Sequence, residues 1–341
     1  HMVERCGFEW PAECPQVERR ADETRQASCC GRPVADGADR CRWHADESGT
    51  DDRVATGAVD PVTQPARGPR GPFTELLDGA ALAGCTLRGG ALAGVALRGA
   101  DLRGATCADA DLRAASLRDA DLREANLTGA DLTDATLRGA DLREANLRRA
   151  TMPDVKLYRA DMRKTYLGRA DLTDANVESA DLTKAYLGRA DLTGAVLGRA
   201  TLTRASLQGA DLTDASIGRA TLRRTTLYKA VLTDAYLGRT DLRGANCNSA
   251  DLSGANLAQV DLEGANLRDA DCAGVTLGRA DVSDANLRDV DLTAANLREA
   301  GLDGSGLENA TLTEASLRDA TLADAALDGA TLHRASFRNA A

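Results

Sequence analysis

The sequence predicts an all-β solenoid from residue 73 to residue 341, in which the backbone turns a corner within every five residues. An apolar residue falls on every fifth position from Leu77 to Phe337, over 53 pentads without an insertion or deletion. A small residue, usually Ala, precedes each of these apolar centres by two positions. Aromatic residues make up only 3% of the chain, so the core must consist of small and medium aliphatic side chains.

A period of five fits neither regular secondary structure. In an α-helix a step of five residues rotates the side chain by about 140°, so no apolar stripe would form. In a flat strand five is an odd number, so successive centres would point to opposite faces. A corner in every pentad lets all centres face one enclosed interior. The centres expected in this core include Leu102, Leu112, Leu122, Leu132 and Leu142.

The residue before each centre indicates how many sides the coil has. Asp occupies this place at 101, 111, 121, 131 and 141, whereas Thr106, Ser116 and Asn126 stand between them. This alternation has a period of ten and favours an even number of sides. Four sides of five residues give a coil of 20, in which like residues stack above like.

The repeating unit reads Ala-(Asp/Asn)-Leu-x-x, as in ADLRE at 120–124 and ANLRR at 145–149. It resembles the pentapeptide-repeat family over about 265 of the 341 residues. The resemblance implies a right-handed quadrilateral β-helix of about 13 coils. At roughly 4.8 Å between stacked strands, such a rod is on the order of 60 Å long.

Three shorter segments precede the solenoid. Residues 1–2 are typical of an expression-tag remnant. Residues 3–45 contain five cysteines and both tryptophans and are expected to form a small Cys/His-rich module. Residues 46–72 contain four prolines and almost no large apolar side chain, so we expect a flexible linker.

The cysteine-rich module is a candidate site for one structural Zn²⁺. Zinc in closed structural sites takes four Cys or His ligands, and a reduced cysteine cluster indicates metal before disulfides. The preferred ligands are Cys6, Cys30, Cys41 and His44, with Cys14 or Cys29 as replacements. An unstructured reduced tail and redox-sensitive thiols remain the alternatives.

Several polar residues fall on interior positions of the solenoid. Cys85, Cys107, Cys247 and Cys272 are expected to be buried free thiols. Hydroxyl side chains that replace the usual Ala are expected to find hydrogen-bond partners: Thr165, Thr225, Thr240 and Ser305.

A coil of 20 residues also predicts surface columns. One carries Arg159, Arg199, Arg219 and Arg239, and the opposite one carries Arg169 and Arg189. These columns are either a basic partner surface or ordinary charge balance, since Arg159, Arg169, Arg189 and Arg239 each precede an Asp by two residues. Tyr166 and Tyr186 are expected to stack, either as a contact patch or as a tolerated aromatic ladder.

The residue inventory argues against an enzyme. No Ser/His/Asp set, phosphate loop or pair of catalytic carboxylates stands out, because the Asp residues recur with the repeat. The favoured function is a protein-interaction scaffold. The family resemblance offers a second function, since some members mimic B-DNA and bind type II topoisomerases.

The charge of the solenoid tests the second function. Residues 77–341 contain 32 basic and 38 acidic residues, whereas duplex DNA carries roughly 35 charges over a comparable length. Arg and Asp are expected to interleave on all faces. We therefore expect no direct nucleic acid binding, and DNA mimicry stays the lesser hypothesis.

No long apolar run or leader occurs in the sequence, so a cytoplasmic location without membrane contact is expected. The repeat is still in register at Ala341. An open coil end exposes apolar centres, so we expect either an end-to-end homodimer through the last coil or a longer parent protein.

Overall fold

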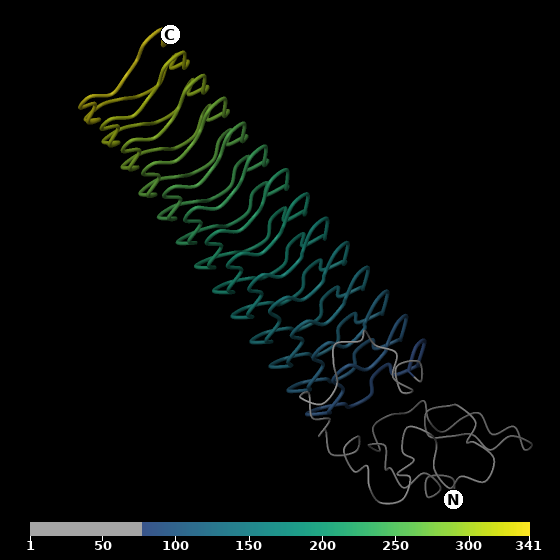
Figure 1. Ribbon diagram of the computed structural model, residues 1–341. Helices are drawn as coiled ribbons and strands as arrows, with labels where there is room; N and C mark the ends of the chain where they lie inside the picture. Colours follow the sequence, from purple (N-terminus) through teal and green to yellow (C-terminus); the bar gives the residue numbers. More distant parts are fainter. Residues whose placement is uncertain (1–76) are drawn as a thin grey trace, which may run out of the picture. The chain divides into compact units, whose positions relative to one another are not determined.

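The computed structural model describes residues 77–341, which fall into two compact units, 77–156 and 157–341. Neither unit contains a helix or a strand longer than one residue. Instead, isolated parallel bridges join residues 20 apart, such as Asp101 to Asp121 in the first unit and Tyr166 to Tyr186 in the second. Two turn residues separate successive bridge positions, so each coil has four sides of five residues. Figure 1 shows the stacked coils of residues 157–341 from teal to yellow.

Every pentad uses its backbone donors in the same way. The centre residue donates to the next coil, as Leu82 N does to Asp101 O at 2.7 Å, and the preceding residue donates to the previous coil, as Asp101 N does to Ala80 O at 2.9 Å. The last residue, such as Gly84, donates to Arg103 O at 2.8 Å. A turn bond closes the corner, with Ala80 N donating to Leu77 O at 3.0 Å. Four of the five donors are therefore satisfied by backbone carbonyls.

The fifth donor explains why Asp or Asn precedes the centre. The N–H of the residue after the centre donates to that side chain, as Arg103 N does to Asp101 Oδ1 at 3.2 Å and Thr128 N does to Asn126 Oδ1 at 3.1 Å. Asp and Asn side chains commonly accept a hydrogen bond from the backbone two residues ahead. The consensus residue thus completes the hydrogen bonding of its own pentad.

The last residue of every pentad adopts a left-handed conformation. All 53 of these positions have positive φ, and only 16 of them are Gly. Positive φ at the third residue of a four-residue turn is the signature of a type II turn, which favours Gly. A side chain there costs roughly 1–2 kcal/mol relative to right-handed backbone. The 37 non-glycine residues at these corners therefore need a reason other than turn formation.

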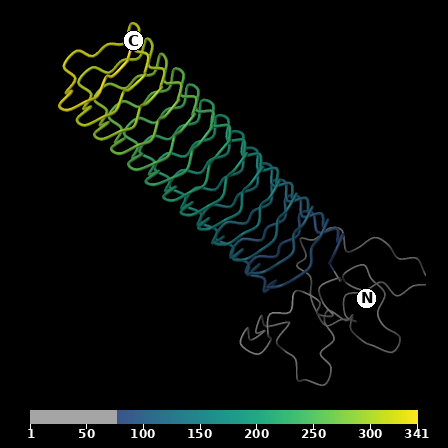
Figure 2. The ribbon, with the colours of Figure 1, turned by 45° about the horizontal axis from the view of Figure 1, so that its top comes forward.

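The interior of each unit is filled by the apolar centres and the small residues beside them. Leu102, Leu112, Leu122, Leu132 and Leu142 are at most 2% exposed, and the adjacent Ala side chains are equally buried. Figure 2 shows from a second direction how successive coils follow one another within each unit. Since each coil packs mainly on its neighbours, the core is continuous along each stack.

The buried hydroxyl groups find the partners that were expected of them. The Oγ1 atoms of Thr225 and Thr240 donate to the carbonyls of Leu202 and Ile217 at 2.8 and 3.1 Å. Ser305 Oγ donates to Leu302 O at 2.7 Å. Each hydroxyl replaces a methyl group without leaving a buried donor unpaired.

The interior cysteines divide into two groups. Cys107, Cys247 and Cys272 are buried free thiols, and burial raises the pKa of Cys107 and of Cys247 to about 12. They are therefore protonated and poor nucleophiles at neutral pH. Cys85 is buried but disulfide-bonded, so the expectation of a free thiol there is wrong. Burial alone does not exclude a covalent partner.

Residues 321–341 are less well covered than the rest of the second unit. The centre Leu332 is 41% exposed, in contrast to Leu312 and Leu317, which are fully buried.

The part of the chain that the structure describes, residues 77–341, contains no helix that could span a membrane.

Candidate interaction surface

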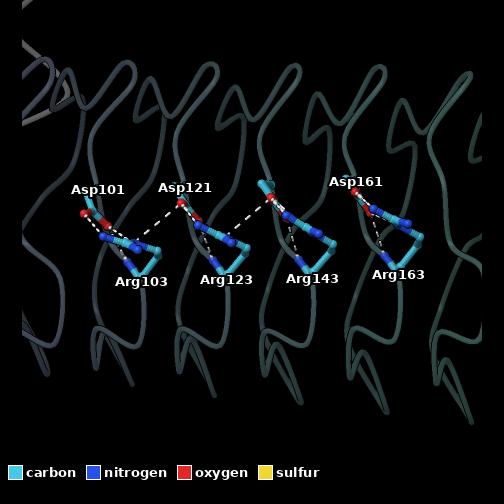
Figure 3. Close-up of polar contacts among 8 residues, drawn as sticks. Asp101, Arg103, Asp121, Arg123, Arg143, Asp161 and Arg163 are labelled. Atoms are coloured by element: carbon cyan, nitrogen blue, oxygen red, sulfur yellow. Dashed lines mark hydrogen bonds and ion pairs between the residues drawn. The ribbon is translucent and has the colours of Figure 1, made fainter.

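An Asp–Arg ladder lies on one side of the first unit. Arg103 Nε and Nη2 donate to the two carboxylate oxygens of Asp101 at 2.8 and 2.6 Å, and Arg123 repeats this geometry with Asp121 (Figure 3). Arg103 also lies 3.6 Å from Asp121 on the next coil. The backbone bond from Arg103 N to Asp101 brings the two side chains together, which is why a spacing of two residues gives a bidentate pair.

This ladder changes the ionisation of its carboxyl groups. The hydrogen bond from Arg103 holds the pKa of Asp101 below its ordinary value, and Arg113 and Arg123 do the same for Asp111 and Asp121. Each carboxylate is thus neutralised within the repeat. The side chains remain partly exposed, so each pair contributes only about 0.2–1 kcal/mol.

The first half of the second unit satisfies its Asp residues differently. Thr173, Thr183 and Thr193 take the place that Arg holds in the ladder. Their hydroxyls donate to Asp171, Asp181 and Asp191 at 2.5–2.7 Å. These carboxylates are therefore hydrogen-bonded without an arginine two residues later.

Arginine has instead moved by one position, to the left-handed corner. In the first unit the order is Leu-Arg-Gly, as at 87–89, 97–99, 102–104 and 137–139, so Gly adopts positive φ. In the second unit it is Leu-Gly-Arg at 167–169, 187–189, 197–199 and 237–239, and Ile-Gly-Arg at 217–219. Arg adopts positive φ at each of these corners. The strained residue is therefore arginine although a glycine stands beside it.

These corners hold five of the six arginines that the sequence predicts as a partner surface, and the sixth, Arg159, follows Tyr158 at a corner of the same kind. Members of one column lie on adjacent coils, since Arg199 N donates to Gly218 O and Arg219 N donates to Gly238 O. Arg159 lies over the Tyr158 ring at 5.1 Å, and Arg239 Nε donates to Gln259 Oε1 at 2.8 Å. Among residues 77–341 the other four have no ion pair: Arg169, Arg189, Arg199 and Arg219.

The charge-balance alternative rested on the Asp two residues after Arg159, Arg169, Arg189 and Arg239. Arg169 and Arg189 form no ion pair with that Asp within residues 77–341. The structure pairs Asp with the Arg two residues after it, as in Asp161 and Arg163 (Figure 3). Arg169 lies in the turn, and Asp171 lies at the bridge position on the next side of the four-sided coil.

Exposed apolar groups accompany the corner arginines. The rings of Tyr166 and Tyr186 stack with centroids 5.1 Å apart and planes 6° apart. Tyr236 is 48% exposed and lies over Gly218 and Gly238, where an added Cβ would approach the ring within 2.6 Å. Because Gly218 and Gly238 have no side chain, the ring of Tyr236 packs directly on their backbone.

The two halves of the second unit carry opposite charge. Residues 157–240 contain 13 basic and 9 acidic residues, a net charge of +4, whereas residues 241–341 contain 8 basic and 17 acidic residues, a net charge of −9. Arg and Asp interleave locally, as expected, but they segregate along the chain. This polarity was missed because charge was counted over the whole solenoid.

A third corner column was also missed. It runs through Lys184, Arg204, Arg224, Gly244, Gly264, Asp284, Gly304 and Asp324, all exposed and all at positive φ. Reading the sequence in steps of 20 from residue 184 would have found it.

The predicted zinc ligands lie outside the described residues, as do segments 3–45 and 46–72. These ligands are Cys6, Cys14, Cys29, Cys30, Cys41 and His44.

Comparison with known proteins places the coils in a family. The family model described as Pentapeptide repeats (8 copies) matches overlapping segments that together run from 77 to 340. None of the curated proteins matched the sequence. Residues 77–341 thus form a β-solenoid of stacked pentads. The chain belongs to the pentapeptide-repeat family.

Solved structures of pentapeptide-repeat proteins are also similar to the chain. HetL of Nostoc sp. strain PCC 7120, involved in heterocyst differentiation regulation, is 32% identical, with 66% of this chain and 88% of HetL covered and a TM-score of 0.43. A protein of the Arabidopsis thaliana thylakoid lumen is 30% identical, with coverage of 33% and 69% and a TM-score of 0.19. A trypsin-treated variant of QnrB1, a plasmid-mediated fluoroquinolone resistance protein, is 17% identical, with coverage of 58% and 89% and a TM-score of 0.30.

Proposed function

We propose that the chain is a non-enzymatic scaffold whose solenoid binds an acidic protein partner through the corner arginines of residues 157–240. The observation that carries this proposal is the order Leu-Gly-Arg. It places arginine at a left-handed corner, although the neighbouring glycine would adopt that conformation at lower cost. The family supports the right-handed winding over about 13 coils that the sequence predicts.

The chemistry of the surface fits a protein partner. Arginine and tyrosine are enriched in the energetically important centres of protein interfaces. Arg199 and Arg219 stand at corners of adjacent coils, and Tyr236 lies over Gly218, which directly precedes Arg219, and over Gly238. Guanidinium groups without an internal carboxylate can form bidentate pairs with Asp and Glu of a partner. The expected partner surface therefore combines carboxylates with an apolar centre.

The proposal is tested by removing the arginines without changing the fold. The same column carries Ser179 and Gln259 at equivalent corners, so Arg199→Ser with Arg219→Gln uses residues that the corner already accepts. We expect this variant to lose proteins that the wild type captures from a cell extract. Asp214→Ser with Asp234→Ser, on a different corner column, is the matched control and should retain them. Identical capture by all three proteins would contradict the proposed surface.

A gyrase supercoiling assay distinguishes the scaffold from a DNA-mimicking regulator of a type II topoisomerase. The net charge of +4 over residues 157–240 disfavours DNA mimicry by this segment. We expect no inhibition by the purified protein at micromolar concentration. Inhibition that survives Arg199→Ser with Arg219→Gln would favour the topoisomerase function and would direct attention to the acidic residues 241–341.

The remaining expectations are part of the same proposal. A structural Zn²⁺ held by Cys6, Cys30, Cys41 and His44 would give residues 3–45 a folded core. A cytoplasmic location favours reduced or metal-bound cysteines, and the disulfide of Cys85 is an exception to that chemistry.

A further inference from the structure

We propose that two copies of the chain associate side by side and antiparallel along the corner column that runs from Lys184 to Asp324, here called the 184–324 column. This goes beyond the proposed scaffold function, because it uses a different corner of the coil and a second copy as the partner. The proposal rests on charge, geometry and the lack of internal partners.

The column is a straight series of residues on adjacent coils. The left-handed residue of each coil donates its N–H to the carbonyl just before the next member of the column. Lys184 N thus donates to Thr203 O at 3.0 Å, and Arg204 N to Arg223 O at 2.9 Å. The same bonds continue from Gly264 to Asp284 and from Asp284 to Gly304. Seven coil steps of roughly 4.8 Å give the column a length of about 34 Å.

The charge of the column changes sign at its middle. Lys184, Arg204 and Arg224 occupy one end, Gly244 and Gly264 the centre, and Asp284 and Asp324 the other end. Within residues 77–341 none of these five charged side chains forms an ion pair. Other exposed charges on this solenoid do have local partners, as Arg103 and Asp101 do.

This arrangement is self-complementary under a two-fold axis between Gly244 and Gly264. Lys184 then lies at the same distance from the axis as Asp324, and Arg224 at the same distance as Asp284. Each ion pair occurs twice in the dimer, because a two-fold interface uses the same patch on both copies. A parallel pairing in register would instead set Arg224 against Arg224 and Asp284 against Asp284.

The spacing of the two columns matches without adjustment. Both copies have the same rise per coil, so Lys184 meets Asp324 and Arg224 meets Asp284 in register, while Arg204 lies opposite Gly304. The central glycines allow close approach, since an added Cβ at Gly264 would have no neighbour within 4 Å. A corner contact of this kind is small and polar, which is typical of weak, salt-dependent association.

Charge reversal of the full chain tests the proposal by sedimentation at low and high ionic strength. We expect a dimer for the wild type at low salt that dissociates at high salt. Arg224→Asp and Asp284→Arg each replace two attractive contacts by two repulsive ones, and each should weaken the dimer at least about tenfold. The double variant Arg224→Asp with Asp284→Arg restores opposite charges and should return the dissociation constant to within a few-fold of wild type.

Two controls and two outcomes complete the test. Asp214→Arg and Arg199→Asp cause the same changes in net charge on other corner columns, and should leave the dimer unchanged. Equal weakening by these controls would overturn the choice of column. A wild-type monomer at low salt would overturn the proposed side-by-side dimer. A dimer that is insensitive to salt and unaffected by Arg224→Asp would also overturn it, because end-to-end contact through the last coil would behave in that way.

Discussion

The two described units use the same backbone and the same core, but they place arginine one position apart. In residues 77–156 arginine follows the apolar centre and forms bidentate pairs with the Asp two residues earlier, as Arg113 does with Asp111. In residues 157–240 threonine satisfies Asp171, Asp181 and Asp191, although Asp161 keeps its Arg163, and arginine stands at the left-handed corner, as Arg199 does. A shift of one residue thus turns an internal ion pair into a charge that faces outward. The position of arginine within the pentad therefore determines whether it pairs with an Asp of the same repeat or faces outward.

The stability of both units should depend on the same kind of apolar core. Leu122→Asp in the first unit and Leu192→Asp in the second place an unpaired carboxylate among fully buried side chains. We expect each change to lower the free energy of unfolding by several kcal/mol, roughly 3–5. Chemical denaturation followed by circular dichroism measures this loss.

Leu122→Met is the matched control, because Met152 and Met162 already serve as buried centres. A swap between two apolar side chains of similar volume costs less than about 1.5 kcal/mol. If Leu122→Asp is no less stable than Leu122→Met, the centre does not face a dry interior and the account of the core is wrong.

Exchanging the order in the first unit should break its ladder. Arg103→Gly with Gly104→Arg converts Leu-Arg-Gly to Leu-Gly-Arg at constant composition. It removes the pair with Asp101 and forces arginine into the left-handed corner, where Gly104 has open space around it. We expect a loss of about 2 kcal/mol in the free energy of unfolding.

Arg103→Thr separates the two causes of this loss, since Thr133 already occupies the equivalent place beside Asp131. That variant should lose only the ion pair, a few tenths of a kcal/mol to about 1 kcal/mol. Equal losses for the double variant and Arg103→Thr would show that arginine at the corner costs nothing.

The reverse exchange in the second unit should stabilise the fold and remove its surface. Gly198→Arg with Arg199→Gly gives glycine the positive φ of residue 199, which we expect to raise the free energy of unfolding by about 1 kcal/mol. Residue 198 has room, since the nearest atoms to an added Cβ lie at 3.8 and 3.9 Å. Thermal unfolding measures the gain, and Arg199→Gly alone should show most of it. A destabilised double variant would mean that Arg199 contributes to the fold itself.

Much of this architecture could be predicted from the sequence, because one period controls it. The spacing of Leu102, Leu112 and Leu122 identified the buried centres and the 20-residue coil. Asp preceding the centre was recognised as a pattern, but its role in binding the N–H two residues ahead was not, since that bond depends on the turn geometry. The left-handed corners were missed for the same reason: only 16 of the 53 are Gly, so no composition signal marks them. Without these corners, Arg169 and Arg189 were compared with the Asp two residues later, and the 184–324 column was not examined.

The smallest expected effect contrasts two Asp residues at equivalent places in the two units. Asp121 is paired with Arg123, and its pKa is lowered by that hydrogen bond. Asp261 is followed by Glu263 and lies 3.1 Å from Arg243, yet its pKa is raised, first by burial and then by the charges of Asp241 and Asp281 on adjacent coils. Asn keeps the backbone cap at either site, as Asn126 shows, and removes only the charge.

The two substitutions should therefore have opposite signs at neutral pH. A carboxyl whose pKa is lowered on folding stabilises the fold above its ordinary pKa of about 4 and loses that contribution as the pH falls through the lowered value. Asp121→Asn should cost on the order of 0.5 kcal/mol at pH 7, and the difference from wild type should vanish in acid. A carboxyl whose pKa is raised destabilises the fold once the pH exceeds that raised value. Asp261→Asn should thus stabilise at pH 7 by a similar amount and become neutral below about pH 4. Denaturation of the two variants at pH 3 and pH 7 measures both trends. A destabilising Asp261→Asn at pH 7 would show that the ion pair with Arg243 outweighs burial and the acidic neighbours of Asp261.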